Sequence, residues 1–272
     1  MIDVKTILLK AKKEVYSTIT GSNLSKLLGE GYDFVELQEY QPYSDIKYIS
    51  WIHSAKLGEI YTKKMVEEKE LNIVVCSMID GRFMIDTKLD TLSYIVALLG
   101  YSSLYFNNNF SYIQFCAKEL IQFQPTKDIK ILEKSLKEIY KCELFKKKID
   151  YKYITQKLMQ SIQKKSLLFL IGDFLDEVDL SILSQKHEVI AIIVRSKWEE
   201  NPKTSSDSQL INPQTGETLN YTLTKRAISY YQKKLKEHDK KLIEHFHKYQ
   251  IRYTKIYNSN EAISKLNGEI GL

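Results

Sequence analysis

The chain has 272 residues, of which 43% are hydrophobic and 27% charged, values close to those of folded proteins and incompatible with wholesale disorder. That length can bury a core without disulfides or metal ions, in one large α/β domain or in a domain with an inserted module. No window has the roughly 18 uninterrupted apolar residues that a membrane span requires. The first residues also lack the apolar run of a signal peptide. We therefore predict a cytoplasmic protein without a membrane span.

The excess of basic over acidic residues does not indicate that the chain binds nucleic acid. The net charge is +6, but only four of the 40 Lys and Arg residues are arginines. Arginine is the residue that base edges and phosphates favour, and no zinc-finger, helix-turn-helix or RNA-binding signature is present. We therefore expect no nucleic-acid partner.

The three cysteines argue against a disulfide framework and against a zinc ribbon. Cys76, Cys116 and Cys142 are odd in number, and none belongs to a Cys-x-x-Cys pair. Cys76 and Cys116 end apolar runs, where a free cysteine behaves as a small buried hydrophobe. We therefore expect a fold that does not depend on disulfides.

Residues 1–70 are predicted to form an N-terminal helix and a β-rich module. Apolar residues recur at helical spacing over residues 3–18, and three glycines then mark a loop. From residue 33 to 70 the pattern changes to short β-like pieces rich in Tyr, Ile and Trp, at residues 34–37, 48–52 and 60–62. No helical periodicity is found there, which predicts an irregular β-rich module.

Residues 71–272 are predicted to form a doubly wound α/β domain. Near-continuous apolar runs are typical of strands buried on both faces, and they occur at residues 71–76, 167–171 and 189–194, with further strands predicted at 112–116 and 251–257. Helical periodicity alternates with these strands, at residues 88–106, 127–140, 150–164 and 222–249. Such alternation implies a mainly parallel sheet with helices on both faces. Ligands in such sheets bind beyond the carboxyl ends of the strands, so the loops at 76–80 and 172–174 are the candidate sites.

A series of short motifs then gives the chain a resemblance to a known group. They are FVELQEYQP (34–42), DIKYISW (45–51), EEKE (67–70), GDF (172–174), EENP (199–202) and PQTGE (213–217). In order and spacing they resemble the bacterial domain-of-unknown-function 58 family, proteins with a von Willebrand A-like domain that are often encoded beside MoxR-type AAA+ ATPases. The resemblance implies that fold for residues 71–272. Family arginines are replaced by Gln38, Lys47 and Lys56, which lose the bidentate fork of a guanidinium.

The resemblance also implies a metal site, from which the residues present depart. A von Willebrand A-type site holds Mg²⁺ with hard oxygen ligands from an Asp-x-Ser-x-Ser loop, a Thr and a later Asp. Here the loop is interpreted as Cys76-x-Met78-x-Asp80, in which two soft sulfur groups replace oxygens. The remaining vestigial ligand candidates are Ser77, Asp80 and Asp173. They could form a rearranged site or serve as turn and helix-cap residues; we favour the second and predict no metal ion and no cofactor, with Mg²⁺ as the ion to exclude.

No catalytic constellation is found. His238 and His245 are seven residues apart on the late helix, with His247 close by, whereas zinc pairs on helices stand three or four apart. We therefore predict ordinary helix-surface histidines. No glycine-rich phosphate loop is present, and Ser77 lacks a nucleophile-elbow setting. The prediction is that the chain is not an enzyme.

The predicted function is a non-enzymatic protein-binding adaptor or scaffold. The partner that the resemblance implies is a MoxR-type AAA+ ATPase, in protein maturation, chaperone-like or stress functions. The residues expected to bind are Glu39, Tyr40, Asp45, Lys47, Trp51, Asp80 and Asp173. For Tyr40 and Trp51, packing of the β-rich module on the core is the competing expectation. The alternative function is a divalent-metal-dependent hydrolase or nuclease-like protein that uses Asp80 and Asp173, with Asp176 as the nearest further ligand. The oligomeric state stays open.

Overall fold

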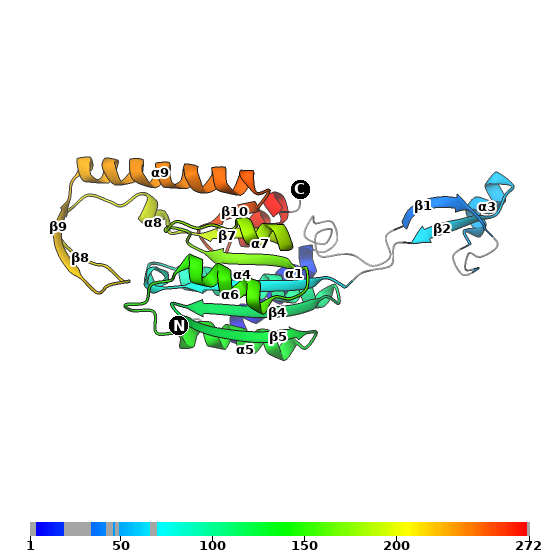
Figure 1. Cartoon of the computed structure of the whole chain (residues 1–272), viewed down its shortest axis with the longest axis horizontal. Helices are drawn as coiled ribbons and strands as arrows, with labels where there is room; N and C mark the ends of the chain where they lie inside the picture. The colour runs from blue at the N-terminus through cyan, green and yellow to red at the C-terminus, as the bar shows by residue number, and fades with distance from the viewer. Residues whose placement is uncertain (1–3, 19–33, 42–45, 47–48, 66–69, 271–272) are drawn as a thin grey trace. The chain divides into compact units, whose positions relative to one another are not determined.

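The computed structural model describes residues 4–18, 34–41, 46, 49–65 and 70–270. Its contacts divide the chain into two units (Figure 1). We call Met1–Leu28 with Leu71–Leu272 the α/β body, and Gly29–Glu70 the hairpin module. None of the described helices has the length and hydrophobicity required of a bilayer-spanning segment.

The α/β body is built on one large sheet, which in the described residues has the strand order β10-β7-β6-β3-β4-β5. Its strands are β3 (Asn72–Ile79), β4 (Asn109–Cys116), β5 (Glu119–Thr126), β6 (Leu167–Gly172), β7 (Glu188–Val194) and β10 (Arg252–Ile256). Every neighbouring pair is parallel except β4 and β5. The mainly parallel sheet is therefore confirmed. Strand β5 was not predicted, because its residues are exposed or half-buried and form no apolar run.

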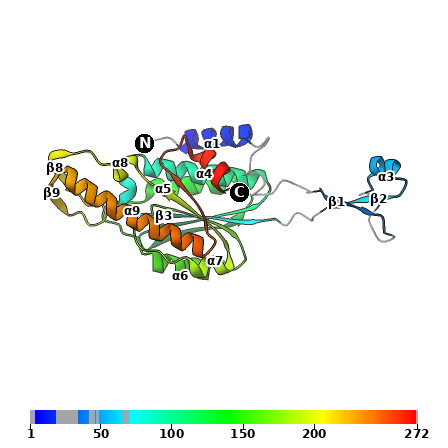
Figure 2. The same ribbon diagram turned by 90° about the horizontal axis from the view of Figure 1, so that it is seen from above.

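Helices cover both faces of this sheet (Figure 2). One face carries α1 (Val4–Thr18), α4 (Lys88–Tyr105), α5 (Ile129–Lys141) and α10 (Ala262–Lys265), followed by a π turn at Leu266–Ile270. The other carries α6 (Tyr151–Ser161), α7 (Ser181–Lys186) and α9 (Lys225–Lys248). Alternate residues of β3 enter the two cores, Val75 one and Cys76 the other, because successive side chains of a strand point to opposite faces. The predicted doubly wound arrangement, with helices on both faces of a mainly parallel sheet, is confirmed, and it is consistent with a von Willebrand A-like fold.

Helix α1 belongs to the α/β body. Its residues Ile7, Ala11 and Val15 are at most 5% exposed and lie in the core formed with α4. The predicted division grouped this helix with the β-rich segment of residues 1–70; the structure corrects that grouping. Helical spacing shows that one face is apolar, but it does not show which unit covers that face.

The hairpin module contains an antiparallel pair, β1 (Phe34–Glu39) and β2 (Tyr61–Met65), and a short helix, α3 (Trp51–Leu57). The predicted β-like piece at residues 48–52 is therefore wrong at its end, since Trp51 and Ile52 begin α3. Gly58 ends this helix with φ of +79°, in the left-handed region that glycine favours. β-branched and aromatic residues favour strands only weakly. At the start of α3 the local context overrides this preference.

A second small hairpin extends from the α/β body. Strands β8 (Ser205–Ile211) and β9 (Thr218–Leu223) pair antiparallel between α8 (Lys197–Glu200) and α9. Gly216, at φ of +76°, lies in the turn that joins them. The PQTGE motif therefore lies at the tip of this hairpin, whereas the GDF motif covers the last residue of β6 and the start of the loop after it.

Cys116 and Cys142 form a disulfide, with Cα atoms 6.6 Å apart. The expectation of a fold without disulfides is wrong for this pair. Cys116 ends β4 and Cys142 caps α5, and the return of α5 over the sheet brings the two together across 26 residues. Cys76 is a free and buried thiol, as expected, and burial raises its pKa.

Candidate functional site at the ends of β3 and β6

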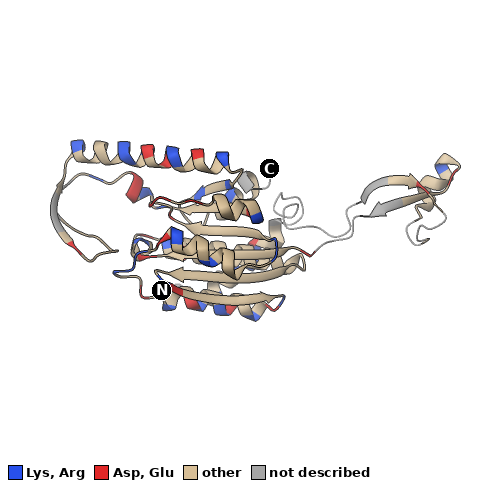
Figure 3. Cartoon of the chain, in the orientation of Figure 1, with Lys and Arg blue, Asp and Glu red and all other residues tan. Residues whose placement is uncertain are grey.

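The site lies where the winding of the sheet reverses. Strands β3 and β6 are neighbours, yet the chain leaves β3 toward α4 on one face and leaves β6 toward α7 on the other. Such a switch point is where α/β sheets place their ligand-binding loops. β3, β4 and β6 carry no charged residue (Figure 3). Asp80 and Asp173 are the first residues beyond β3 and β6, and both are 0% exposed.

The structure changes the register of the first loop. Cys76 and Met78, predicted at the leading carboxylate and at a hydroxyl position, lie inside β3 and are fully buried. Asp80 is the residue that follows the strand, so it takes the place of the leading carboxylate. The motif then reads Asp80-x-Arg82-x-Met84, in which Arg82 and Met84 stand at the two serine positions. Asp80 also accepts a hydrogen bond from the Arg82 backbone at 2.9 Å and caps the short 3₁₀ helix Gly81–Met84.

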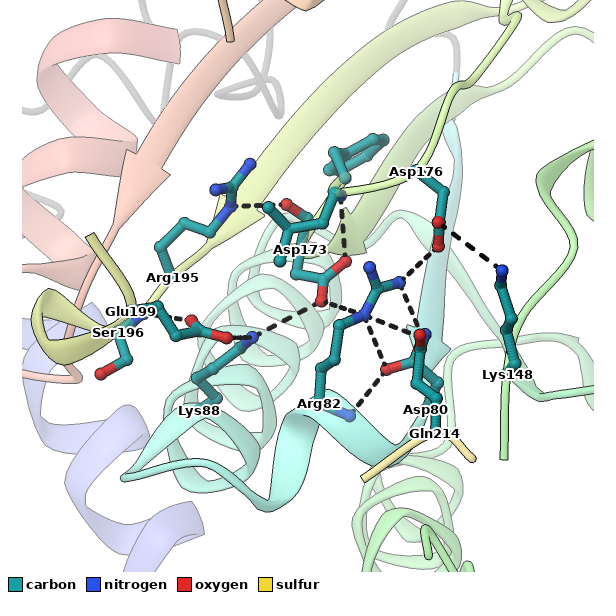
Figure 4. A network of polar contacts seen from close by, with 12 residues as sticks. Asp80, Arg82, Lys88, Lys148, Asp173, Asp176, Arg195, Ser196, Glu199 and Gln214 are labelled. Carbon is teal, nitrogen blue, oxygen red and sulfur yellow. Dashed lines mark hydrogen bonds and ion pairs between the residues drawn. The ribbon is translucent and has the colours of Figure 1, made fainter. Parts of the chain in front are cut away.

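The side chain of Arg82 lies among three carboxylates (Figure 4). Its Nη2 lies 2.8 Å from an oxygen of Asp80 and 2.8 Å from an oxygen of Asp176, and its Nε lies 2.9 Å from Asp173 Oδ2. The side chain is 11% exposed. Burial disfavours the charged guanidinium, but the nearby carboxylates of Asp173 and Asp80 outweigh it and raise the pKa of Arg82. Arg82 is thus a permanent cation at the switch point.

A second buried cation completes the pairing. Lys88, at the start of α4, is 1% exposed, and its Nζ lies 2.9 Å from Glu199 Oε1 and 3.5 Å from Asp173 Oδ2. Glu199 is the glutamate of the EENP motif and also accepts a hydrogen bond from the Ser196 backbone in the capping box of α8. The buried carboxylates of this loop cluster therefore have cationic partners, as charges removed from water require.

The β8–β9 hairpin brings its tip to the same place. Gln214 of the PQTGE motif donates from Nε2 to Asp80 Oδ2 at 2.7 Å, and the backbone of Lys146 donates to the Pro213 carbonyl at 2.8 Å. Gly81 makes this approach feasible, because a Cβ on it would clash with the Pro213 carbonyl oxygen. The hairpin tip is thereby held against the loop after β3.

The loop after β6 is held by neighbours on both sides. Phe174 has a φ of +50°, a conformation that non-glycine residues adopt only when their surroundings impose it. Its N–H donates to the Tyr151 hydroxyl at 3.0 Å, and its buried ring contacts those of Tyr151 and Phe246. Arg195, also fully buried, donates to the Asp173 carbonyl at 2.7 Å and lies 3.1 Å from Asp239.

These residues do not fit a divalent ion. Arg82 already contacts the carboxylates of Asp80, Asp173 and Asp176, so an added cation would meet a fixed positive charge instead of free oxygen ligands. Ser77 is inside β3 and fully buried. Among the described residues no group of three or more His, Cys, Asp or Glu side chains is arranged to hold a metal ion.

The late-helix histidines are engaged individually. His238 Nε2 lies 2.8 Å from the Phe174 carbonyl, His245 Nε2 accepts from the Leu180 N–H at 3.0 Å, and the ring of His247 contacts Tyr253. A cavity of about 420 Å³ lies beside His238 and His245, between α9 and the loop that carries Asp176. The rings of His238 and His245 therefore hold α9 against the segment between β6 and α7, a role that the sequence did not suggest.

The expected partner-binding residues fall into separate places. Asp80 and Asp173 are fully buried, so their side chains contribute to the loops from inside, and their predicted part in partner binding stays a prediction. In the hairpin module Trp51 is 65% exposed, Glu39 is exposed and Tyr40 half-buried. Asp45 and Lys47 lie outside the described residues.

Sequence reasoning missed Arg82 and Lys88, the two cations of the network. One signal was available for Arg82, because it stands two residues after Asp80, where a metal-binding loop has its first serine. Lys88 gave no such signal, since its partner Glu199 is 111 residues away.

The network residues lie within a recognised family region. A family model described as "Protein of unknown function DUF58" matches residues 36–241, which include Asp80, Arg82, Lys88, Asp173 and Glu199. A comparison with curated proteins finds no match.

Solved structures similar to this chain include two from Bacteroides species. The conserved hypothetical protein BatB from Bacteroides thetaiotaomicron has a TM-score of 0.44 and 13% identity, covering 74% of this chain and 97% of that one. An aerotolerance-related membrane protein from Bacteroides fragilis NCTC 9343, with multiple mutations to serines, has a TM-score of 0.45 and 15% identity, covering 74% and 98%.

Proposed function

The chain belongs to the DUF58 family of proteins of unknown function, and from that premise we propose that it is a non-enzymatic adaptor that binds a protein partner through its hairpin module. One observation carries the proposal. Helix α3 begins with two neighbouring exposed apolar residues, Trp51 at 65% and Ile52 at 72%. We call these two residues the α3 patch.

The interior of the module does not account for these side chains. Its buried residues in the described part are polar, namely Ser50, Ser54 and Thr62. The Ser54 hydroxyl donates to the Ser50 carbonyl at 2.9 Å and accepts from the Tyr61 N–H at 2.8 Å. A small unit that buries hydrogen-bonded serines and exposes a tryptophan and an isoleucine is typical of a surface that another protein covers.

Trp51 is the expected anchor of that contact. Tryptophan is enriched among interface residues that contribute most of the binding energy. Ser50 Oγ lies 2.8 Å from His53 Nδ1, which fixes the first turn of α3 beneath it. As partner we propose a MoxR-type AAA+ ATPase, on the strength of the family resemblance, with roles in protein maturation or stress.

The alternative of a metal-dependent hydrolase has less support. It needs free carboxylates, and the three at the switch point are bonded to Arg82. A screen of the purified chain against phosphoesters and nucleic acids, with and without divalent ions, addresses it directly. Turnover that requires the ion and disappears in Asp173→Asn would favour that alternative.

The test of the adaptor uses the full chain and the purified MoxR-type ATPase of the same genome. We expect a complex by calorimetry, and a loss of affinity of about 30-fold or more for Trp51→Ser, the usual scale of an interface anchor. Leu9→Ser is the matched control, because Leu9 is 68% exposed and lies on α1. Absence of a complex would reject this partner. Trp51→Ser could also lower the stability of the free chain and leave the affinity unchanged. That result would show that Trp51 packs within its own chain, and it would reject the α3 patch as the binding surface.

A further inference from the structure

We propose that the Arg82 guanidinium is a built-in replacement for a divalent ion, and that shortening this one side chain opens a cation site among Asp80, Asp173 and Asp176. This side chain holds the ends of β3 and β6 together and has no contact with the proposed partner-binding residues of the hairpin module among its described contacts.

The first support is the convergence of the carboxylates on one group. Oxygens of Asp80 lie 2.8 Å from Nη2 and 3.2 Å from Nε of Arg82. Asp176 lies 2.8 Å from the same Nη2, and Asp173 lies 2.9 Å from the same Nε. Three carboxylates from two loops are thus arranged around two adjacent nitrogens of one side chain. Carboxylate oxygens are the hard ligands that a small divalent cation takes, and here those of Asp80, Asp173 and Asp176 contact the guanidinium instead.

The second support is the charge balance. Asp80, Asp173 and Glu199 are buried, and the cations in contact with them are Arg82 and Lys88. Loss of Arg82 leaves Asp80 without a cationic partner among its described contacts and leaves Asp173 with Lys88 at 3.5 Å. An uncompensated buried charge is strongly unfavourable, so the cavity left by the guanidinium favours another cation.

The third support is access. Asp176 is 34% exposed and Arg82 is 11% exposed, so the cluster reaches solvent on the Asp176 side. Water can therefore enter and complete the coordination of an ion that keeps several waters, as Mg²⁺ does. Met84, at the second serine position, is 54% exposed and does not occupy this space.

The experiment compares the wild type with Arg82→Ser in Mg²⁺ and in Mn²⁺, by calorimetry and thermal unfolding. Wild type is expected to bind neither ion. Arg82→Ser is expected to bind Mn²⁺ and to melt at least about 2 °C higher in excess metal. Arg82→Ser/Asp173→Asn should lose most of that response. Arg252→Ser is the matched control, because Arg252 pairs with Glu188 away from the site, and it should show none.

Two further measurements test the proposal if Arg82→Ser folds poorly. Refolding yield of this variant should rise when Mn²⁺ is present and stay low with a chelator. Arg82→Lys, which keeps a cation, should fold and show no metal response. Metal binding by the wild type, an equal response of Arg82→Lys, or an Arg82→Ser that neither binds nor is rescued would each overturn the proposal.

Discussion

Arg82 Nε lies 2.9 Å from Asp173 Oδ2, and this contact joins the loop after β3 to the loop after β6. The two strands are adjacent in the sheet, but their loops lead to helices on opposite faces. An arginine from the loop after β3 makes the bridge between them.

The Lys88–Glu199 pair should be a major contributor to stability. Lys88→Met leaves Glu199 buried without its cation, and breaking a buried pair in this way typically costs about 3–5 kcal/mol. Lys88→Met/Glu199→Gln should recover part of the loss, because the unpaired charge is gone. Urea unfolding followed by circular dichroism measures both variants.

The control for this pair is Lys137→Met, which removes an exposed partner of Glu133 on α5. Its free energy of unfolding should stay close to that of the wild type, since exposed pairs contribute little. Equal effects of Lys88→Met and Lys137→Met would show that the buried network is not important for stability.

Gly81 should be essential for docking the β8–β9 hairpin. In Gly81→Ala the new methyl group meets the Pro213 carbonyl, so the hairpin tip must move and Gln214 must leave Asp80. Forced overpacking of this kind costs about 1–3 kcal/mol. Gly268→Ala is the control, because nothing lies within 4 Å of a Cβ there.

A double-mutant cycle separates this effect from general strain. Gln214→Ala should destabilise the wild type more than it destabilises Gly81→Ala, where the hydrogen bond is already lost. Strict additivity of the two substitutions would contradict the proposed link between Gly81 and the Gln214–Asp80 contact.

The sequence predicted the buried parallel strands but not the chemistry of the site, and the reason is physical. β3 and β6 are continuous apolar runs, so their identity as buried parallel strands, and the loops after them, followed directly. The end of β3 did not, because Cys76, Met78 and Asp80 fit a two-residue spacing as well as Asp80, Arg82 and Met84 do. Only the backbone shows that the strand continues to Ile79.

The pairings that neutralise the site were not accessible for a different reason. Lys88 and Glu199 meet across 111 residues and Gln214 and Asp80 across 134. The spacing of residues along the sequence does not predict contacts between residues so far apart. The sequence motifs EENP and PQTGE marked the right segments through the resemblance, but the contacts that they make depend on the tertiary fold.

Reduction of the Cys116–Cys142 disulfide should destabilise the α/β body. The bridge closes a loop across 26 residues, for which the chain-entropy estimate is about 3.5 kcal/mol. A reductant should therefore lower the melting temperature of the wild type. It should not change that of Cys142→Ser, which has already lost the bridge. A wild type insensitive to the reductant would show that the bridge does not stabilise the fold.

His187 should make the stability of the chain sensitive to mild acid. It is 3% exposed at the end of α7, and neither ring nitrogen has a hydrogen-bond partner in the described structure. Burial, with a smaller effect of Lys186, lowers its pKa from the ordinary value of 6.5. The unfolded chain therefore takes up the proton first as the pH falls. The stability contributed by neutral His187 is fully present above pH 6.5 and is lost as the pH falls toward the lower folded-state pKa.

The measurement is the free energy of unfolding between pH 7.5 and about pH 5.5, a window that lies above the ordinary range of most carboxylates. His187→Phe keeps an aromatic ring and removes the titration, so its stability should fall less steeply with acid than that of the wild type. Some slope should remain, because burial also lowers the pKa of His245. If His187→Phe and the wild type have the same slope, protonation of His187 is not coupled to folding, and its ring must be hydrated or paired in solution.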